Sequence, residues 1–202
     1  MGKIKKIIAL VFAVLLVIFT FSSCGCGKKV SEGEAKNLIK TLVDASYDIN
    51  VAIYEGLPYY ERADAQGSLF APVADEAKYT SIADMKLAIR KVFSEDYSSA
   101  LEALAFDGYD GASFGYHTQP RYIDKEGELF VLREFYETDF DSEKYGEYEG
   151  VKVKKYDTTN IEIVKISKRF IEGKIKSEDK STEITVTLIL ENKQWRLDSP
   201  TY

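Results

Sequence analysis

The chain is poor in the side chains on which most catalytic and metal sites depend. Its 202 residues include one histidine, His117, and two cysteines, Cys24 and Cys26. Both cysteines precede residue 31, where the sequence predicts that the folded part begins, so that part holds no cysteine. This inventory excludes catalysis by a Cys–His pair, the common zinc sites and a disulfide framework. We expect a protein without a metal ion, a cofactor or enzymatic activity.

The sequence also lacks an excess of positive charge. It has 27 Lys and Arg against 33 Asp and Glu, which gives a formal net charge of −6. Removing residues 1–23 would take away three lysines and no acidic residue, and would lower the net charge to −9. An acidic chain repels nucleic acid and anionic lipid surfaces, so neither is an expected partner. A basic protein or a cationic component of a cell wall is compatible with this charge.

The one long apolar run lies at the N-terminus. Three lysines within the first six residues precede an apolar segment at 7–21. This segment is shorter than the roughly 20 residues that a membrane-spanning helix needs. The pattern predicts a secretory signal at 1–23, followed by a polar spacer at 24–30. A plain signal peptide or an uncleaved anchor would share the same pattern.

The end of this run carries a more specific feature. Ser22 and Ser23 are small and directly precede Cys24, and this boundary resembles the lipobox of bacterial lipoproteins. The resemblance implies that Cys24 becomes an acylated N-terminus, so that its lipid holds the protein on the extracytoplasmic face of the cell membrane. Cys26 is the weaker acceptor, because Ser23 would then stand where the lipobox prefers a larger apolar residue.

Helical periodicity dominates residues 31–107, the expected helical part of a single domain at 31–202. Helix N-caps are expected at Ser31, at Thr80 or Ser81, and at Ser94. The first forms a capping box with Glu34, and its helix is expected to end near residue 54. Gly108 is expected to end the third helix.

The segment 55–78 between the first two helices is rich in Gly and Pro and is predicted to be irregular. It is either a functional loop or, as we prefer, a surface wrap pinned to the fold by apolar side chains. The expected pins are Tyr59, Tyr60, Leu69 and Phe70.

From residue 120 the apolar residues recur with a period of two, which predicts a β part at 120–202. The expected strands are 121–123, 129–136, 160–170, 182–190 and 194–198. A charged segment at 173–180 is expected to connect two of them. Helices followed by antiparallel strands predict an α+β fold, in which the N-terminal helices pack on a C-terminal twisted antiparallel sheet. We expect Trp195 in the shared core.

One segment matches a catalytic motif literally. Residues 111–115 read G-A-S-F-G, the G-x-S-x-G pattern of a nucleophile elbow around Ser113, and His117 follows closely. An elbow needs a buried strand that leads in and a helix that leads out, and neither is predicted here. We therefore interpret the segment as a Gly-rich turn, with His117 as a hydrogen-bonding residue of the surface or of a cleft.

Acidic residues concentrate in two places. They are Glu137, Asp139, Asp141, Glu143, Glu147 and Glu149 in a loop at 138–150 and its margin, and Asp107, Asp110 and Asp124 around a second loop. Grouped carboxylates can bind calcium or hydrolyse glycosidic bonds. Neither group has the spacing of an EF-hand, and a solvated acidic face is the preferred interpretation.

Two segments are similar to parts of one known family. The first runs from Y-T-S-I-A-D-M at 79–85 to V-F-S-E-D-Y at 92–97, and the second is W-R-L-D-S-P-T-Y at 195–202. They resemble a helix pair and the closing strand of the IseA-type inhibitors of cell-wall DL-endopeptidases in Gram-positive bacteria. The resemblance covers about half of the chain that follows the signal. The W-x-L-D ending also occurs in cone-shaped α+β domains related to nuclear transport factor two.

The resemblance implies a non-enzymatic lipoprotein that blocks the catalytic cleft of a secreted peptidoglycan hydrolase of the NlpC/P60 type. It places the contact in the acidic loops, so the expected partner-binding residues are Asp139, Asp141 and Glu143. The lipid would confine inhibition to the membrane side of the wall. The alternative is a ligand-binding or sensory lipoprotein with a cone-shaped α+β pocket between sheet and helices.

Overall fold

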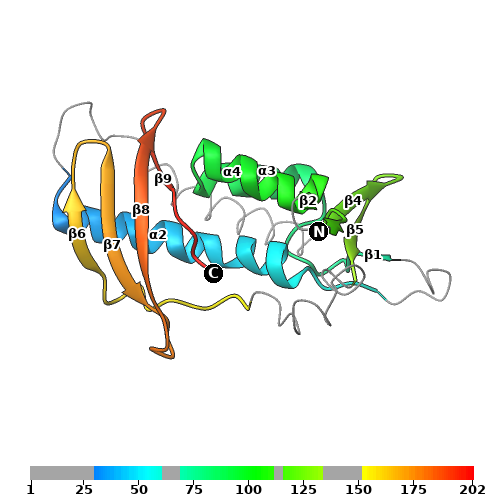
Figure 1. Cartoon of the computed structure of the whole chain (residues 1–202), viewed down its shortest axis with the longest axis horizontal. Coiled ribbons are helices and arrows are strands. Elements are labelled where there is room, and N and C mark those ends of the chain that lie inside the picture. The colour runs from blue at the N-terminus through cyan, green and yellow to red at the C-terminus, as the bar shows by residue number, and fades with distance from the viewer. Residues whose placement is uncertain (1–29, 61–68, 112–115, 134–151) are drawn as a thin grey trace, which may run out of the picture.

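A computed structural model describes residues 30–60, 69–111, 116–133 and 152–202 (Figure 1). Its elements, in order, are α2 (Glu32–Asn50), the π-helical turn η1 (Val51–Glu55), β1 (Phe70–Pro72), α3 (Ile82–Val92), α4 (Glu95–Glu102), the π-helical turn η3 (Ala103–Asp107), β2 (Tyr109–Gly111), β3 (Tyr116–Thr118), β4 (Tyr122–Lys125), β5 (Glu128–Leu132), β6 (Glu162–Ile166), β7 (Phe170–Lys176), β8 (Glu183–Glu191) and β9 (Gln194–Leu197). Helices in the N-terminal half and antiparallel sheets confirm the α+β prediction.

The three helices begin at the predicted caps, and of the two candidates for the second helix the structure selects Ser81. Ser31 accepts a hydrogen bond from Glu34 N, and the Glu34 carboxylate accepts one from Ser31 N at 2.8 Å, which completes the predicted capping box. Ser81 and Ser94 cap α3 and α4 in the same way, through side-chain oxygens that satisfy otherwise unpaired backbone N–H groups. Gly108 ends the third helical segment with φ 80°, as predicted.

The C-terminal sheet has the strand order β6-β7-β8-β9 and is antiparallel throughout. The expectation of one strand at 160–170 and a charged connection at 173–180 is wrong, because the chain turns at 167–169 and β7 occupies 170–176. Along β7, three residues are buried in alternation with charged ones: Ile171, Gly173 and Ile175. The charges therefore mark one face of a strand and not a loop.

Helix α2 packs against β6, β7 and β9, and Figure 1 shows it running across the sheet. At Gly173 in β7 a Cβ atom would lie 2.7 Å from Ile39 Cδ1 and 3.1 Å from the Glu162 carbonyl oxygen. Helix and sheet are thus in direct contact there, with no room for a further carbon. The fully buried side chains of this interface include Ile39, Ile171, Ile175, Val186, Leu188 and Leu197. Trp195 joins the same core, as predicted.

A three-stranded sheet, β1-β5-β4, lies at the opposite end of the molecule from the four-stranded sheet (Figure 1). Its strand β1 falls inside the segment expected to be irregular. Backbone bonds from Tyr60 N to Pro72 O and from Val73 N to Leu129 O, both 2.9 Å, hold this segment. The expected apolar packing of the pins is mostly wrong, since Tyr59, Tyr60 and Leu69 are exposed and Phe70 is only half-buried. The Tyr60 hydroxyl instead holds the segment by accepting from Asp75 N at 3.2 Å.

Tyr122 on β4 joins the small sheet to the helices. Its hydroxyl donates to Ala52 O at 2.5 Å and accepts from Leu57 N at 3.0 Å. The side chain is fully buried, and this burial raises the pKa of the phenol. The two bonds satisfy backbone groups where η1 ends, so β4 is fixed to the C-terminal end of the first helix.

A buried polar network fixes the C-terminal segment to α2. Ser46 Oγ donates its only proton to Val43 O at 2.8 Å, so Thr201 Oγ1 must donate to Ser46 across their 2.7 Å contact. Asn50 Nδ2 donates to both Thr201 Oγ1 and Thr201 O at 2.9 Å. The helix and the residues after β9 are therefore held in one register.

No helix of the described ranges is both long and apolar enough to span a membrane.

Candidate functional site

Most residues that the sequence singled out lie outside the described part of the chain. These are Cys24, Cys26, Ser113, Asp139, Asp141 and Glu143. His117 is placed in β3, where it is paired with Asp110 of β2. Within the described ranges, no three His, Cys, Asp or Glu side chains gather in a way that could hold a metal ion.

The G-x-S-x-G segment has a different context from the one that we expected. A short strand, β2, does lead into it, and an antiparallel strand, β3, follows it. A nucleophile elbow joins a strand to a helix, whereas here a strand is followed by its hairpin partner. The predicted Gly-rich turn falls mostly on residues 112–115, which lie outside the described part of the chain.

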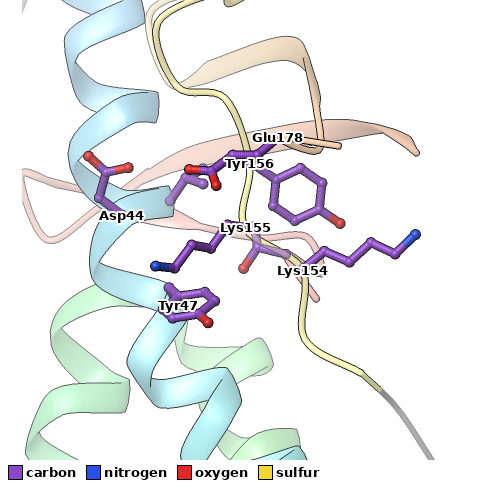
Figure 2. A pocket seen from close by; sticks show the side chains of 8 residues that line it. Asp44, Tyr47, Lys154, Lys155, Tyr156 and Glu178 are labelled. Atoms are coloured by element: carbon purple, nitrogen blue, oxygen red, sulfur yellow. The ribbon is translucent and has the colours of Figure 1, made fainter. Parts of the chain in front are cut away.

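One hollow lies between α2 and the extended segment 152–156; we term it the helix cleft (Figure 2). Its volume is about 150 Å³, and it is lined by Val43, Asp44, Tyr47, Lys154, Lys155, Tyr156, Glu178 and Thr201. Backbone bonds fix its outer wall, since Glu178 N donates to Lys155 O at 2.9 Å and Asp157 N donates to Lys176 O at 2.8 Å. The cleft thus joins four segments that are distant in the sequence.

The charges of the helix cleft are only partly paired. Asp44 accepts from Lys40 Nζ at 2.7 Å and from Thr158 Oγ1 at 2.9 Å, so both of its oxygens are engaged. The Lys155 ammonium lies 5.0 Å from the centre of the Tyr47 ring, and no carboxylate of the described residues lies within 4.0 Å of it. Figure 2 shows Lys154 and Lys155 leaving their segment in opposite directions.

Tyr156 and Asp179 stabilise the wall of this cleft. The Tyr156 hydroxyl donates to Tyr202 O at 3.3 Å, and burial, followed by the charge of Asp179, raises its pKa. Asp179 accepts hydrogen bonds from the Ser177 hydroxyl and from the backbone and hydroxyl of Ser181. These bonds lower the pKa of Asp179 to about 2. The lining of the cleft includes the charged groups of Lys154 and Lys155 and the ring of Tyr47, which suit contact with a polar partner.

A second hollow, which we term the turn groove, lies between α3, α4 and the β8–β9 turn. Its volume is about 410 Å³, and it is lined by Arg90, Phe93, Glu95, Ser98, Ser99, Glu102, Glu191, Asn192, Gln194 and Arg196. Asn192 and Lys193 form the turn with φ of 48° and 64°, which brings Glu191 back over the first residue of α4. Glu191 Oε2 accepts from Glu95 N at 3.0 Å.

Arginines stand at two positions in the turn groove and differ in their partners. Arg90 makes a bidentate pair with Glu102, with Nε–Oε1 of 2.6 Å and Nη2–Oε2 of 2.7 Å. Arg196 is half-buried and donates to Trp195 O at 3.3 Å and to the Gln194 side-chain oxygen. The groove thus holds one guanidinium that is paired with a carboxylate and one that is bound only to neutral oxygens.

Sequence reasoning did not find these groups. Lys154 and Lys155 follow the acidic loop as ordinary charged residues, and Glu178 falls in the segment that was expected to connect two strands. The position of Arg196 could have been predicted, because side chains alternate along a strand. Arg196 therefore lies on the face of β9 opposite to Trp195 and Leu197.

Comparison with protein families and with curated proteins gives no relative from which a function could be transferred. No protein-family model matches the chain, and no curated protein matches it.

Proposed function

We propose that the chain is an extracytoplasmic lipoprotein that acts without catalysis, by binding and inhibiting a secreted cell-wall endopeptidase of the NlpC/P60 type. The direct packing of α2 on the four-stranded sheet is the observation that carries the proposal. Around Gly173 and Ile39 the helix and the sheet are in direct contact, and buried side chains fill the space between them. This packing favours recognition at the surface, as in a protein–protein contact.

Two surface features support contact with another protein. The helix cleft, at about 150 Å³, is about half the lower limit of roughly 300 Å³ for small-molecule pockets, so it suits a partner's side chain better than a whole ligand. Tyr59 and Tyr60 are exposed by 39% and 38% at the small sheet. Tyrosine is enriched at protein interfaces, because its ring buries apolar area while its hydroxyl finds a partner.

The alternative of a ligand-binding or sensory lipoprotein rests on a different observation. The turn groove, at about 410 Å³, is within the size range of ligand pockets, and its lining is mostly polar. A ligand there would be recognised by charges and amides, and not by the aromatic residues that the sequence suggested.

Neutralising Asp139, Asp141 and Glu143 together should slow association with an NlpC/P60 endopeptidase at least several-fold. Exposed acidic groups accelerate encounter with a basic partner, and salt screens them over about 8 Å at physiological ionic strength. Biolayer interferometry at low and at high salt would measure the association rate. We expect the native rate to fall with salt and the Asn/Asn/Gln variant to show a smaller salt dependence.

The matched control changes the net charge equally at Asp96, Glu126 and Glu162, three exposed acidic residues outside the acidic loop. Its association rate should stay close to the native rate at each salt concentration. An equal slowing in both triple variants would show a general charge effect and would remove the acidic loop from the proposed contact. If the native chain shows no binding to the endopeptidase at any salt concentration, the proposal itself is contradicted.

A further inference from the structure

Arg196 lacks the partner that a guanidinium usually has in a folded protein. It lies on the outer face of β9, it is half-buried, and it lines the turn groove. Its hydrogen-bond partners are neutral oxygens of Trp195 and Gln194, and within the described ranges no carboxylate lies within 4.0 Å of it. Burial lowers the pKa of this guanidinium, and the nearby charge of Glu191 offsets part of the effect. The two contacts use one N–H of Nη1 and one of Nη2, so the remaining N–H groups of the guanidinium can donate to a carboxylate from outside.

The other cations at this hollow are already paired. Arg90 is held by both oxygens of Glu102, and Lys86 Nζ also approaches Glu102 at 3.9 Å. Both carboxylate oxygens of Glu102 are thus engaged by other cations, and neither forms an ion pair with Arg196. The groove therefore contains one guanidinium, that of Arg196, which forms no ion pair within 4.0 Å with a carboxylate of the described residues.

The opposite wall of the groove offers free acceptors. Glu191 uses Oε2 for Glu95 N at 3.0 Å, and its second carboxylate oxygen makes no hydrogen bond with the described residues. The Glu95 side chain is exposed, and within these residues its carboxylate takes part in no ion pair. Asn192, at the turn, adds an amide that can donate and accept. The hollow thus presents a guanidinium and two carboxylates to the same space.

We propose that the turn groove binds a short zwitterionic peptide, with the peptide carboxylate on Arg196 and its ammonium on Glu95 and Glu191. The volume of about 410 Å³ lies within the roughly 300–1,000 Å³ of small-ligand sites and admits a few small residues. Charge-assisted and bidentate hydrogen bonds would fix the orientation of the peptide. This site is separate from the proposed contact with a hydrolase and does not depend on it.

Three related peptides test each charge of the proposed ligand separately. Tri-alanine carries both charges, tri-alanine amide lacks the carboxylate, and N-acetyl-tri-alanine lacks the ammonium. Isothermal titration calorimetry with the full chain in mild detergent should show binding of tri-alanine, and each blocked peptide should bind at least tenfold more weakly. Equal affinity for all three, or no binding of tri-alanine at millimolar concentration, would overturn the proposal.

Two substitutions connect the binding to Arg196. Arg196→Gln should abolish tri-alanine binding, and Arg196→Lys should weaken it, because an ammonium keeps the charge and loses the planar fork. Arg169→Gln is the matched control, since Arg169 is exposed, contacts Leu190 O at 3.4 Å and does not line the groove. Native-like binding by a folded Arg196→Gln would contradict the site. If that variant is unfolded, the three peptides with the native protein still decide.

Discussion

Replacing Trp195 by alanine is expected to destabilise the folded domain by about 3–5 kcal/mol, as for other large aromatic deletions in cores. Trp195 is 8% exposed on the inner face of β9, where it belongs to the core that α2 and the sheet share. Its effect comes from packing, because its Nε1 has no hydrogen-bond partner in the described part of the chain. The free energy of unfolding from urea denaturation would measure the loss.

Two control variants isolate the packing contribution. Trp195→Phe keeps a large ring and sacrifices no hydrogen bond, so its destabilisation should be less than half that of the alanine variant. Leu87→Ala removes an aliphatic side chain that is 55% exposed on α3, and it should change stability by no more than about 0.5 kcal/mol. A near-neutral Trp195→Ala would place the indole at a binding surface and would favour the ligand-binding alternative.

Cys24→Ala should remove the protein from the membrane fraction or leave it unprocessed. The proposed anchor is a lipid on Cys24, and buried acyl chains contribute about 0.8 kcal/mol per CH₂ to membrane binding. Without the thiol no such chain can be attached. Mass spectrometry of the native membrane-bound protein should identify an acylated Cys24, such as a palmitoyl form, as the N-terminal residue.

Cys26→Ala is the control for this experiment, because it removes the second cysteine and keeps the first. It should remain acylated and in the membrane fraction. A mature N-terminus at any other residue, or release by Cys26→Ala and not by Cys24→Ala, would contradict the assignment of the lipid to Cys24.

Local chemistry made the helical part of the fold predictable. A side chain that caps its own helix acts within a few residues, so Ser31 and Ser94 marked the starts of two helices correctly, and the start of the other was predicted to within one residue, at Thr80 or Ser81. The strand β7 was missed because Glu172, Lys174 and Lys176 suggested a loop. Their partners across the sheet, which are set by register with β8, are not visible in the local sequence.

The two hollows could not be predicted for a related reason. The helix cleft joins Tyr47 of α2 to Lys155 and to Glu178, and the turn groove joins Arg90 of α3 to Arg196 of β9. The lining residues of each hollow have no regular spacing in the sequence, because the packing of the helices on the sheet is what brings them together. The sequence did predict Asp139, Asp141 and Glu143 as a contact, and these residues lie outside the described ranges.

The most direct test of the proposed function is the rate at which a purified NlpC/P60 DL-endopeptidase digests cell-wall peptidoglycan in the presence of the domain 31–202. We predict that increasing amounts of the domain lower the rate until inhibition is complete near an equimolar ratio, and that the domain alone releases no fragments. An unchanged rate at saturating domain, or digestion by the domain alone, would contradict a non-enzymatic inhibitor.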